Sequence, residues 1–260
     1  MEKVSVIVPT YNREFHILNL IEFFLKQTYP NKELLILDDS PQPSVTIAEI
    51  SERYENVHYF YEPVKQMLGV KLNTLAERTQ GSIIVMFDDD DYYAPQYITR
   101  MVEVLNRQDL DFVTLSKWFS YCSYLNQFFY WEADRMSPVH YLVDPTQDTL
   151  TQLHYDVPNS NLVHDWTWGY GWKYVFRKKL YEQVRYRDLP IWENGRCVDY
   201  LFYEDAARQN FKMGHFADLE GLALHLIHRG NSTAIVPQHL LPNVFLPVFF
   251  KEFNISQVLQ

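Results

Sequence analysis

Cysteine is scarce in this sequence of 260 residues, because only Cys122 and Cys197 occur. Two cysteines cannot build the disulfide framework of a small secreted domain or a zinc site made of thiolates. We therefore expect two buried thiols. No stretch approaches the ~20 apolar residues that a membrane-spanning helix needs, and the N-terminus lacks the apolar core of a signal peptide. These absences predict a cytoplasmic domain.

Basic residues are also few, since 23 Lys and Arg stand against 33 Asp and Glu, which gives a net charge of −10. A general nucleic-acid binder would present a basic surface, so we expect no nucleic-acid partner. The negative net charge does not exclude an anionic small substrate, because a bound metal ion can make the electric field at its site positive. Aromatic residues make up 16% of the chain, and many of them lie between Trp118 and Trp192.

Four consecutive carboxylates, Asp88 to Asp91, follow the apolar stretch 82–87. Isoleucine and valine in that stretch favour a buried strand. Side chains two apart in a strand point to the same side, so we expect Asp88 and Asp90 to reach toward one cation. Carboxylate oxygens suit Mg²⁺ or Mn²⁺, which also bind substrate phosphates. The alternative interpretation is a solvated acidic turn.

Apolar patterns alternate between strand and helix over the first 116 residues. The spacing predicts a helix after Asn12 as its cap, and helices near 45–54, 70–78 and after Gln96. Strands are expected at 4–8, 33–37, 57–61, 83–87 and 111–116. This alternation predicts right-handed βαβ crossovers and a mainly parallel sheet. Ligands bind beyond the carboxyl ends of such strands, where residues 9–12, 38–39 and 88–91 converge.

Several of these segments together resemble the family 2 glycosyltransferases of the GT-A fold. They are residues 4–13, 33–40, 69–73 and 81–91, followed by Gly169-Tyr-Gly171, Tyr203-Glu-Asp205 and 228–232. The resemblance implies an α/β fold with a Rossmann-like, mainly parallel central sheet flanked by helices, and an aromatic-rich acceptor-binding half. This sequence departs from the family pattern at Met67-Leu-Gly-Val-Lys71, where the family is richer in Gly and Ala.

We also expect three successive parts of the chain to have different roles. Residues 1–100 would bind the nucleotide sugar, 101–235 would hold the acceptor and the catalytic groups, and 236–260 would form a docking tail. The tail could dock on the core, on a second copy of the chain or on a membrane surface.

By resemblance, the donor is a nucleotide-diphosphate sugar, with a UDP-sugar favoured. Asp39 would contact the base and Asp88 the ribose, while Lys71 would face the base or a phosphate unless it is a solvated helix lysine. The full donor-binding set is Pro9, Thr10, Tyr11, Asp38, Asp39, Lys71, Asp88 and Asp89. Asp90 would be the direct ligand of Mn²⁺ or Mg²⁺, which neutralises the diphosphate leaving group. Asp88 and His228 would assist, with His225 as the alternative histidine.

The acceptor is expected to be a hydroxyl of a glycan or another molecule, and its proton needs a base within hydrogen-bond reach. We expect a helix to begin at Glu204 and Asp205, and the resemblance makes Asp205 the base of an inverting enzyme and Glu204 its support. Aromatic faces stack on sugar rings. The expected acceptor-binding residues are Trp168, Gly169, Tyr170, Gly171 and Trp172.

Three rival functions stay open at this point. A nucleotidyltransferase would carry a glycine-rich loop after the first strand, which residues 9–13 lack. A haloacid-dehalogenase-like phosphatase would need Thr or Val where Tyr92 stands. A non-catalytic sugar-nucleotide-binding module would not need the acid pairs at 38–39, 88–91 and 204–205.

Overall fold

The computed structural model describes residues 1–260 apart from 157–158, 191, 194–195, 232–233 and 254–260. Within these limits the chain forms two compact units. The first unit comprises 1–90, 95–114 and 168–215, and the second comprises 91–94, 115–167 and 216–260. Each unit is described by itself below.

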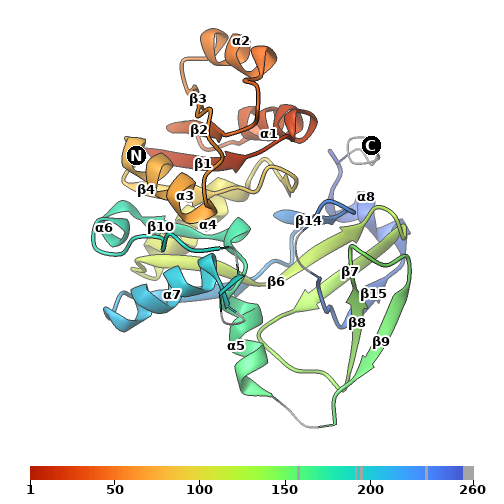
Figure 1. Cartoon of the computed structure of the whole chain (residues 1–260). Coiled ribbons are helices and arrows are strands. Elements are labelled where there is room, and N and C mark those ends of the chain that lie inside the picture. The colour runs from red at the N-terminus through yellow and green to blue at the C-terminus, as the bar shows by residue number, and fades with distance from the viewer. Residues whose placement is uncertain (157–158, 191, 194–195, 232–233, 254–260) are drawn as a thin grey trace. The chain divides into compact units, whose positions relative to one another are not determined.

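A mainly parallel sheet organises the first unit (Figure 1). Four parallel strands lie in the order β3-β2-β1-β4, and β10 pairs antiparallel with β4 and with the first residues of β6. Their bounds are β1 Val4–Thr10, β2 Lys32–Asp38, β3 Val57–Tyr61, β4 Ile83–Met86, β6 Phe112–Cys122 and β10 Val175–Arg177. Val6, Ile7 and Val8 are fully buried. The β-branched runs in the sequence thus form the centre of this sheet.

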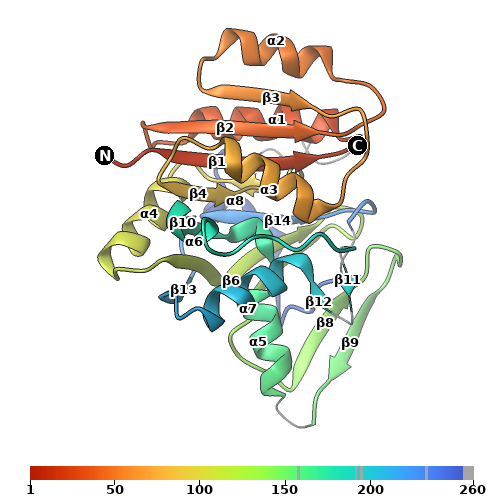
Figure 2. The ribbon, with the colours of Figure 1, turned by 60° about the vertical axis from the view of Figure 1, so that its left-hand side comes forward.

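Helices cover both faces of the sheet, with α1 and α3 on opposite faces in Figure 2. The chain runs outward from β1 to β3 and then returns through α3 to β4 on the other side of β1. Right-handed crossovers put the returning helix on the opposite face. The switch point between β1 and β4 is where such folds bind ligands. The helices are α1 Glu14–Lys26, α2 Val45–Arg53, α3 Leu68–Arg78, α4 Tyr97–Arg107, α6 Lys178–Tyr181 and α7 Val198–Arg208, with the short helix η1 Gly171–Lys173.

Most of the expected elements of the first unit are confirmed, and the strand at 57–61 agrees at both ends. Two local predictions are wrong. Asn12 does not cap α1, because it has a φ of 54° and the cap position belongs to Arg13. The strand β4 ends at Met86, so the aspartates follow it in a turn and strand alternation does not govern where they point.

The second unit is built on antiparallel pairs. The strand β6 continues into it and pairs antiparallel with β7, which pairs with β15, while β14 lies parallel to β6 and antiparallel to β5. The bounds are β5 Tyr92–Tyr93, β7 Gln127–Glu132, β14 Ala223–Ile227 and β15 His239–Leu241, and β8 Val139–Val143 forms a hairpin with β9 Leu150–His154. The strands β11 Trp192–Glu193 and β12 Arg196–Cys197 pair antiparallel in the first unit, and the remaining elements are β13 Met213–Ala217, α5 Ser160–Trp168, η2 Asn243–Phe245 and α8 Leu246–Phe249.

Aromatic side chains fill the second unit's core. Trp118 and Trp131 are fully buried, with ring centroids 4.9 Å apart. In the C-terminal segment, Phe249 and Phe250 pack on Phe119 at 4.4 and 5.5 Å. The last part of the predicted docking tail, 254–260, lies outside the described residues, as does Ser232 of the segment 228–232. Among the helices described, none combines the length and apolar character needed to cross a membrane.

Candidate active site

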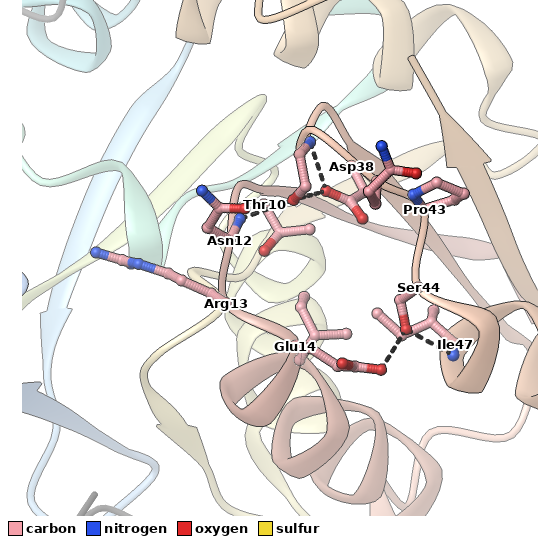
Figure 3. Close-up of a pocket in the computed structure, with 11 residues that line it drawn as sticks. Thr10, Asn12, Arg13, Glu14, Asp38, Pro43, Ser44 and Ile47 are labelled. Atoms are coloured by element: carbon pink, nitrogen blue, oxygen red, sulfur yellow. Dashed lines mark hydrogen bonds between the residues drawn. The ribbon is translucent and has the colours of Figure 1, made fainter. Parts of the chain in front are cut away.

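A cavity of about 330 Å³ lies in the first unit where β1 and β2 end and α1 and α2 begin (Figure 3). Its polar side chains hold one another in place. Asp38, only 3% exposed, accepts hydrogen bonds from the Tyr59 hydroxyl at 2.7 Å and the Ser40 backbone N–H at 2.9 Å. Glu14 accepts from the Ser44 hydroxyl at 2.6 Å. The lining residues are Thr10, Asn12, Arg13, Glu14, Ile17, Asp38, Ser40, Gln42, Pro43, Ser44 and Ile47.

Asp39 and Lys71 form a buried ion pair beside this cavity's edge. The Lys71 ammonium lies 2.5 Å from Asp39 Oδ1 and donates to the Thr10 carbonyl at the same distance. The other oxygen of Asp39 accepts from the Gln66 backbone N–H at 2.7 Å. Burial lowers the pKa of Lys71, against the attraction of Asp39. The alternative of a solvated lysine is therefore wrong, and the pair is a fixed part of the predicted donor site.

Two further predicted donor residues flank Thr10, the last residue of β1. Pro9 lies within β1, opposite Leu37 of β2. Tyr11 follows the strand, and the Lys65 ammonium lies 3.8 Å from the centroid of its ring. A cation over the ring face is held by the ring quadrupole. Lys65 therefore covers one face of the Tyr11 ring.

The aspartates after β4 are tied to the loop after β1. Asp89 accepts from the Thr10 hydroxyl at 2.7 Å and from Arg13 Nη1 at 2.8 Å. The same Nη1 donates to Asp90 Oδ2 at 2.6 Å. Asp89 and Asp90 are each 6% exposed. Burial, followed by the charge of Asp90, raises the pKa of Asp89 to about 6, although Arg13 and Thr10 oppose this. These buried carboxylates are thus only partly neutralised.

The carboxylates suit a divalent cation by chemistry and by spacing. One oxygen each from Asp88, Asp90 and Asp91 lies within 4.8 Å of the others. Oxygen-only donor sets are those that Mg²⁺ and Mn²⁺ prefer. Asp91 is also bonded to His225 Nδ1 at 2.9 Å and to the Leu226 N–H at 2.8 Å. Asp90 is likewise bonded to Arg13, and Asp88 and Asp90 as the direct ligands stay a prediction.

The two candidate histidines both lie in the second unit. His225 is held by Asp91, as described above, while His228 Nδ1 accepts a hydrogen bond from the Gly230 backbone N–H at 3.0 Å in a turn. His228 as a metal ligand, with His225 as the alternative, stays a prediction.

The predicted base, Asp205, and its neighbour Glu204 lie inside a helix rather than at its start, because α7 begins at Val198. Arg187 holds Asp205 with two hydrogen bonds, Nε to Oδ2 at 2.9 Å and Nη2 to Oδ1 at 2.7 Å. Glu204 pairs with Arg196 at 2.8 Å and with Arg208 at 3.0 Å. Both carboxylates are therefore already neutralised by arginines, and their catalytic roles stay untested predictions.

Another carboxylate, Asp199, occupies the first turn of α7. Its Oδ1 is buried and has no hydrogen-bond partner among the described residues. Burial raises the pKa of Asp199 to about 6, although the Gly171 N–H and the charge of Lys173 lower it. A Cβ on Gly171 would lie 2.4 Å from the Asp199 carboxyl carbon, so only glycine leaves room for this group.

Tyr186 relates Asp199 to the aspartates after β4. Burial raises the pKa of Tyr186, and the charges of Asp199, Tyr181 and Asp88 raise it further. The Tyr186 hydroxyl donates to the sulfur of Met86, the last residue of β4, at 2.7 Å. The Tyr186 hydroxyl thus contacts the last residue of β4. Sequence reasoning missed Asp199, although its place at the start of α7 was the available signal.

The predicted acceptor-binding aromatics are largely covered. Trp168, 9% exposed, stacks on Tyr203 with centroids 4.3 Å apart and planes 8° apart. Trp172 is 2% exposed. Gly169 and Tyr170 are half-buried. Trp168 and Trp172 thus pack inside the first unit, and the acceptor role of this segment stays a prediction.

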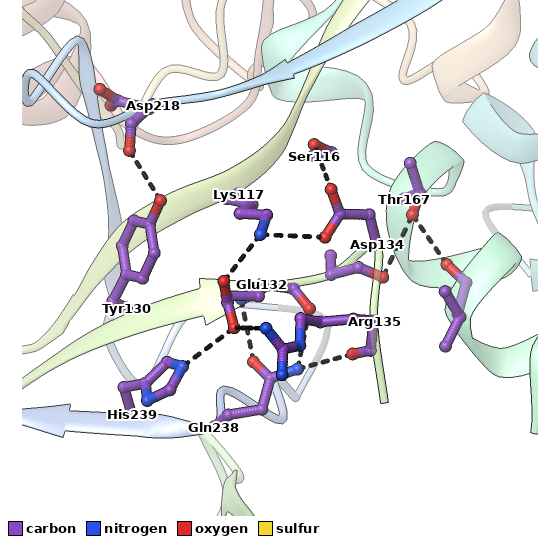
Figure 4. A network of polar contacts seen from close by, with 12 residues as sticks. Ser116, Lys117, Tyr130, Glu132, Asp134, Arg135, Thr167, Asp218, Gln238 and His239 are labelled. Atoms are coloured by element: carbon purple, nitrogen blue, oxygen red, sulfur yellow. Dashed lines mark hydrogen bonds and ion pairs between the residues drawn. The ribbon is translucent and has the colours of Figure 1, made fainter. Parts of the chain in front are cut away.

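A polar network occupies the second unit around Glu132, at the end of β7 (Figure 4). Lys117 donates to Glu132 Oε1 at 2.7 Å, and His239 lies 3.2 Å from Oε2. The Gln238 side chain donates to the Glu132 carbonyl and accepts from its N–H. Burial acts against the charge, but Lys117 and His239 lower the pKa of Glu132 below its ordinary value. This network joins β6, β7 and the segment leading into β15.

Comparison with known proteins gives consistent matches. The family model described as Glycosyl transferase family 2 matches residues 5–184. The putative glycosyltransferase EpsH of Bacillus subtilis (strain 168) is 27% identical over 188 residues, which is 70% of this chain and 49% of that protein. The chain spans less than half the length of this protein and of other curated glycosyltransferases that it matches.

Solved structures share the fold. S. aureus TarS (residues 1–349) in complex with UDP-GlcNAc matches with a TM-score of 0.62 at 18% identity, covering 90% of this chain and 62% of that one. The mannosyltransferase PcManGT from Pyrobaculum calidifontis, in complex with GDP-Man and Mn²⁺, matches with a TM-score of 0.57 at 16% identity, covering 86% and 56%. The sheet and the family model together show that this chain belongs to the family 2 glycosyltransferases, with a GT-A-type α/β fold.

Proposed function

We propose that this chain transfers a sugar from a nucleotide-diphosphate sugar, with a UDP-sugar favoured, to a hydroxyl of a glycan or another acceptor, with inversion at the anomeric carbon. One observation carries the proposal. The buried groups Thr10, Asp39, Lys71, Asp89 and Asp90 are linked around the strand ends at the switch point of a parallel sheet. Doubly wound folds bind nucleotides at this place.

The relatives support the choice of donor. Structures of the two neighbours above carry UDP-GlcNAc and GDP-Man as bound donors. In this chain, Asp38 and Asp39 offer acceptor oxygens, and the Tyr11 ring offers a face for the base. We assign nucleotide affinity to Asp39 and Lys71, because their contacts would be the same before and during the reaction.

A divalent cation, Mn²⁺ or Mg²⁺, would be held by Asp88 and Asp90, and when bound it would neutralise the diphosphate that leaves. Thr10 donates to Asp89, and Arg13 bridges Asp89 and Asp90 beside this proposed site. His228 stays our proposed additional ligand. In the reaction the acceptor oxygen bonds to the anomeric carbon, the bond from that carbon to the phosphate oxygen breaks, and the hydroxyl proton passes to a carboxylate.

We assign that proton to Asp199 rather than to Asp205. A general base should have a pKa near the working pH and room to accept a proton. Asp199 has a pKa raised to about 6, and its unpartnered Oδ1 is closed off beside Gly171, so an acceptor hydroxyl reaches it only when that segment moves. Asp205 is held by two hydrogen bonds from Arg187, which favours its charged form and weakens it as a base. Asp205 and Glu204 remain the alternative, and the variants described in the Discussion compare them.

We propose that the segment from Trp168 to Trp172 binds the acceptor. Gly169 and Tyr170 are half-buried there and are the most exposed residues of the segment. Trp168 and Trp172 would support this surface from beneath through their buried rings.

The test is a screen of UDP-, GDP- and dTDP-sugars by thermal unfolding, with Mn²⁺ or with EDTA. A true donor at 100 times its Kd should stabilise the chain by about 2.7 kcal/mol. The Asp90→Asn variant is the matched control, and it should lose the Mn²⁺-dependent part of the shift. Product NMR with the best donor then gives the anomeric configuration. Equal shifts in EDTA would refute metal dependence, and a retained configuration would refute inversion.

A further inference from the structure

Arg13 lines the cavity at the ends of β1 and β2, and its side chain reaches the aspartates after β4. It follows Asn12, whose left-handed backbone turns the chain sharply at the end of β1, and it stands at the cap position of α1. Its side chain extends away from the cavity in Figure 3. Nη1 ends 2.8 Å from Asp89 Oδ1 and 2.6 Å from Asp90 Oδ2. One guanidinium nitrogen thus binds two carboxylates of the run.

The guanidinium and a divalent cation would use the same carboxylate. Asp90 is the proposed metal ligand, and its Oδ2 is the atom that Arg13 contacts. If the metal takes Oδ2, Arg13 has to leave it. If the metal takes the other oxygen, two cations stand close together and repel each other. Both arrangements weaken metal binding while Arg13 remains there.

Asp89 provides the attachment that keeps Arg13 in this place. It is 6% exposed, it accepts from the Thr10 hydroxyl at 2.7 Å, and it lies outside the group of three carboxylates spaced for a cation. Asp88 adds its charge to those of Asp90 and Asp89 around the guanidinium. Arg13 is therefore held by the carboxylates as a group.

We infer that Arg13 is a built-in competitor of the metal, which keeps the metal affinity of Asp88 and Asp90 low until a diphosphate is present. A diphosphate supplies oxygens that a guanidinium binds well. Arg13 can then exchange Asp90 for phosphate oxygens, so that the metal and the donor bind together. The inference rests on the proposed function, because it takes the metal and the diphosphate from there.

The experiment measures Mn²⁺ binding by electron paramagnetic resonance, first with Mn²⁺ alone and then with saturating UDP. Arg13→Gln should bind Mn²⁺ alone roughly tenfold more tightly than the wild type, which corresponds to about 1.4 kcal/mol. The gain in Mn²⁺ affinity caused by UDP should be smaller in this variant than in the wild type. Arg100→Gln is the matched control, because Arg100 pairs with Glu103 on the exposed face of α4, and it should leave both values unchanged.

Two more variants keep the inference falsifiable. Arg13→Lys retains the positive charge and should bind Mn²⁺ within about threefold of the wild type, a spread in keeping with the scatter of single-site effects. Arg13→Met replaces the glutamine variant if circular dichroism shows that Arg13→Gln does not fold. Unchanged or weaker Mn²⁺ binding in the uncharged variants overturns the inference. A wild-type protein that binds no Mn²⁺, alone or with UDP, instead refutes the metal dependence in the proposed function.

Discussion

Two groups of charged side chains, one in each unit, are built in opposite ways. Around Asp89 in the first unit the carboxylates outnumber the cation, and the pKa of Asp89 is raised to about 6. Around Glu132 in the second unit lie Lys117, Arg135 and His239, with Lys117 shared by Asp134, and the pKa of Glu132 is lowered. The first group would gain from an added cation, whereas the second is already neutralised. The comparison separates a group with an excess of carboxylates from one whose charges are balanced across strands.

The largest expected effect lies with the acid whose charge is least compensated. Asp199→Asn keeps the shape of the side chain but cannot accept the proton, so kcat should fall by about 10²–10⁴. Single-turnover rates measure this, and donor affinity should be nearly unchanged. Asp205→Asn is the matched control on the same helix. If Asp205→Asn shows the larger loss and Asp199→Asn transfers sugar at a near wild-type rate, the base is Asp205.

Breaking the buried pair in the first unit should cost stability. Lys71→Met leaves Asp39 buried without its cation, and removal of one partner of a buried ion pair costs about 3–5 kcal/mol. Urea unfolding gives the free energy. The double variant Lys71→Met/Asp39→Leu should recover a large part of this loss, because no charge is then left alone. A single variant within about 1 kcal/mol of the wild type would contradict the buried-pair interpretation.

The free energy of unfolding should change with pH because of the titration of Asp199. Its pKa in the folded chain is raised to about 6 from the ordinary value of 3.8, so the folded state binds the proton more tightly than the unfolded state. The stabilisation from proton binding to Asp199 is fully present below the ordinary pKa of 3.8 and is lost as the pH rises through the folded-state pKa of about 6. A shift of this size corresponds to at most about 3 kcal/mol. Asp199→Asn should therefore be more stable than the wild type at neutral pH while losing activity, and chemical unfolding from mildly acidic to mildly basic pH measures the difference.

The smallest effect is expected in the second unit. Glu132→Gln removes the charge from a partly exposed network, and such ion pairs contribute about 0–1 kcal/mol. The melting temperature should change by a few degrees at most, and the Mn²⁺ affinity should stay that of the wild type. A change in Mn²⁺ affinity would show that the two charged groups are coupled and that the comparison fails.

The sequence predicted the first unit well because its strands are short β-branched runs that end at polar clusters. Val57–Tyr61 was predicted at both ends, and β1 and β2 within two residues. The second unit was not predicted in detail, since strands such as 127–132 carry aromatic residues on both faces and show no alternation.

The misplaced start of α7 has a physical cause. Its cap position is Cys197, which makes no side-chain hydrogen bond to the helix, so the usual sequence signal of a helix start is missing there. Glu204 and Asp205 were consequently taken for first-turn acids, and Asp199 was overlooked. The aspartates at 88–91 were found, and Asp88 and Asp90 do approach one another, but strand alternation is not the reason because β4 ends at Met86.

The contact between Gly171 and Asp199 has a consequence for directed evolution of this chain. A methyl group at position 171 would overlap the Asp199 carboxyl group, with its carbon 2.4 Å away. In a saturation library selected for sugar transfer, position 171 should return glycine alone. Selected for folding alone, the same library should admit alanine at 171 once Asp199 is replaced by glycine or alanine.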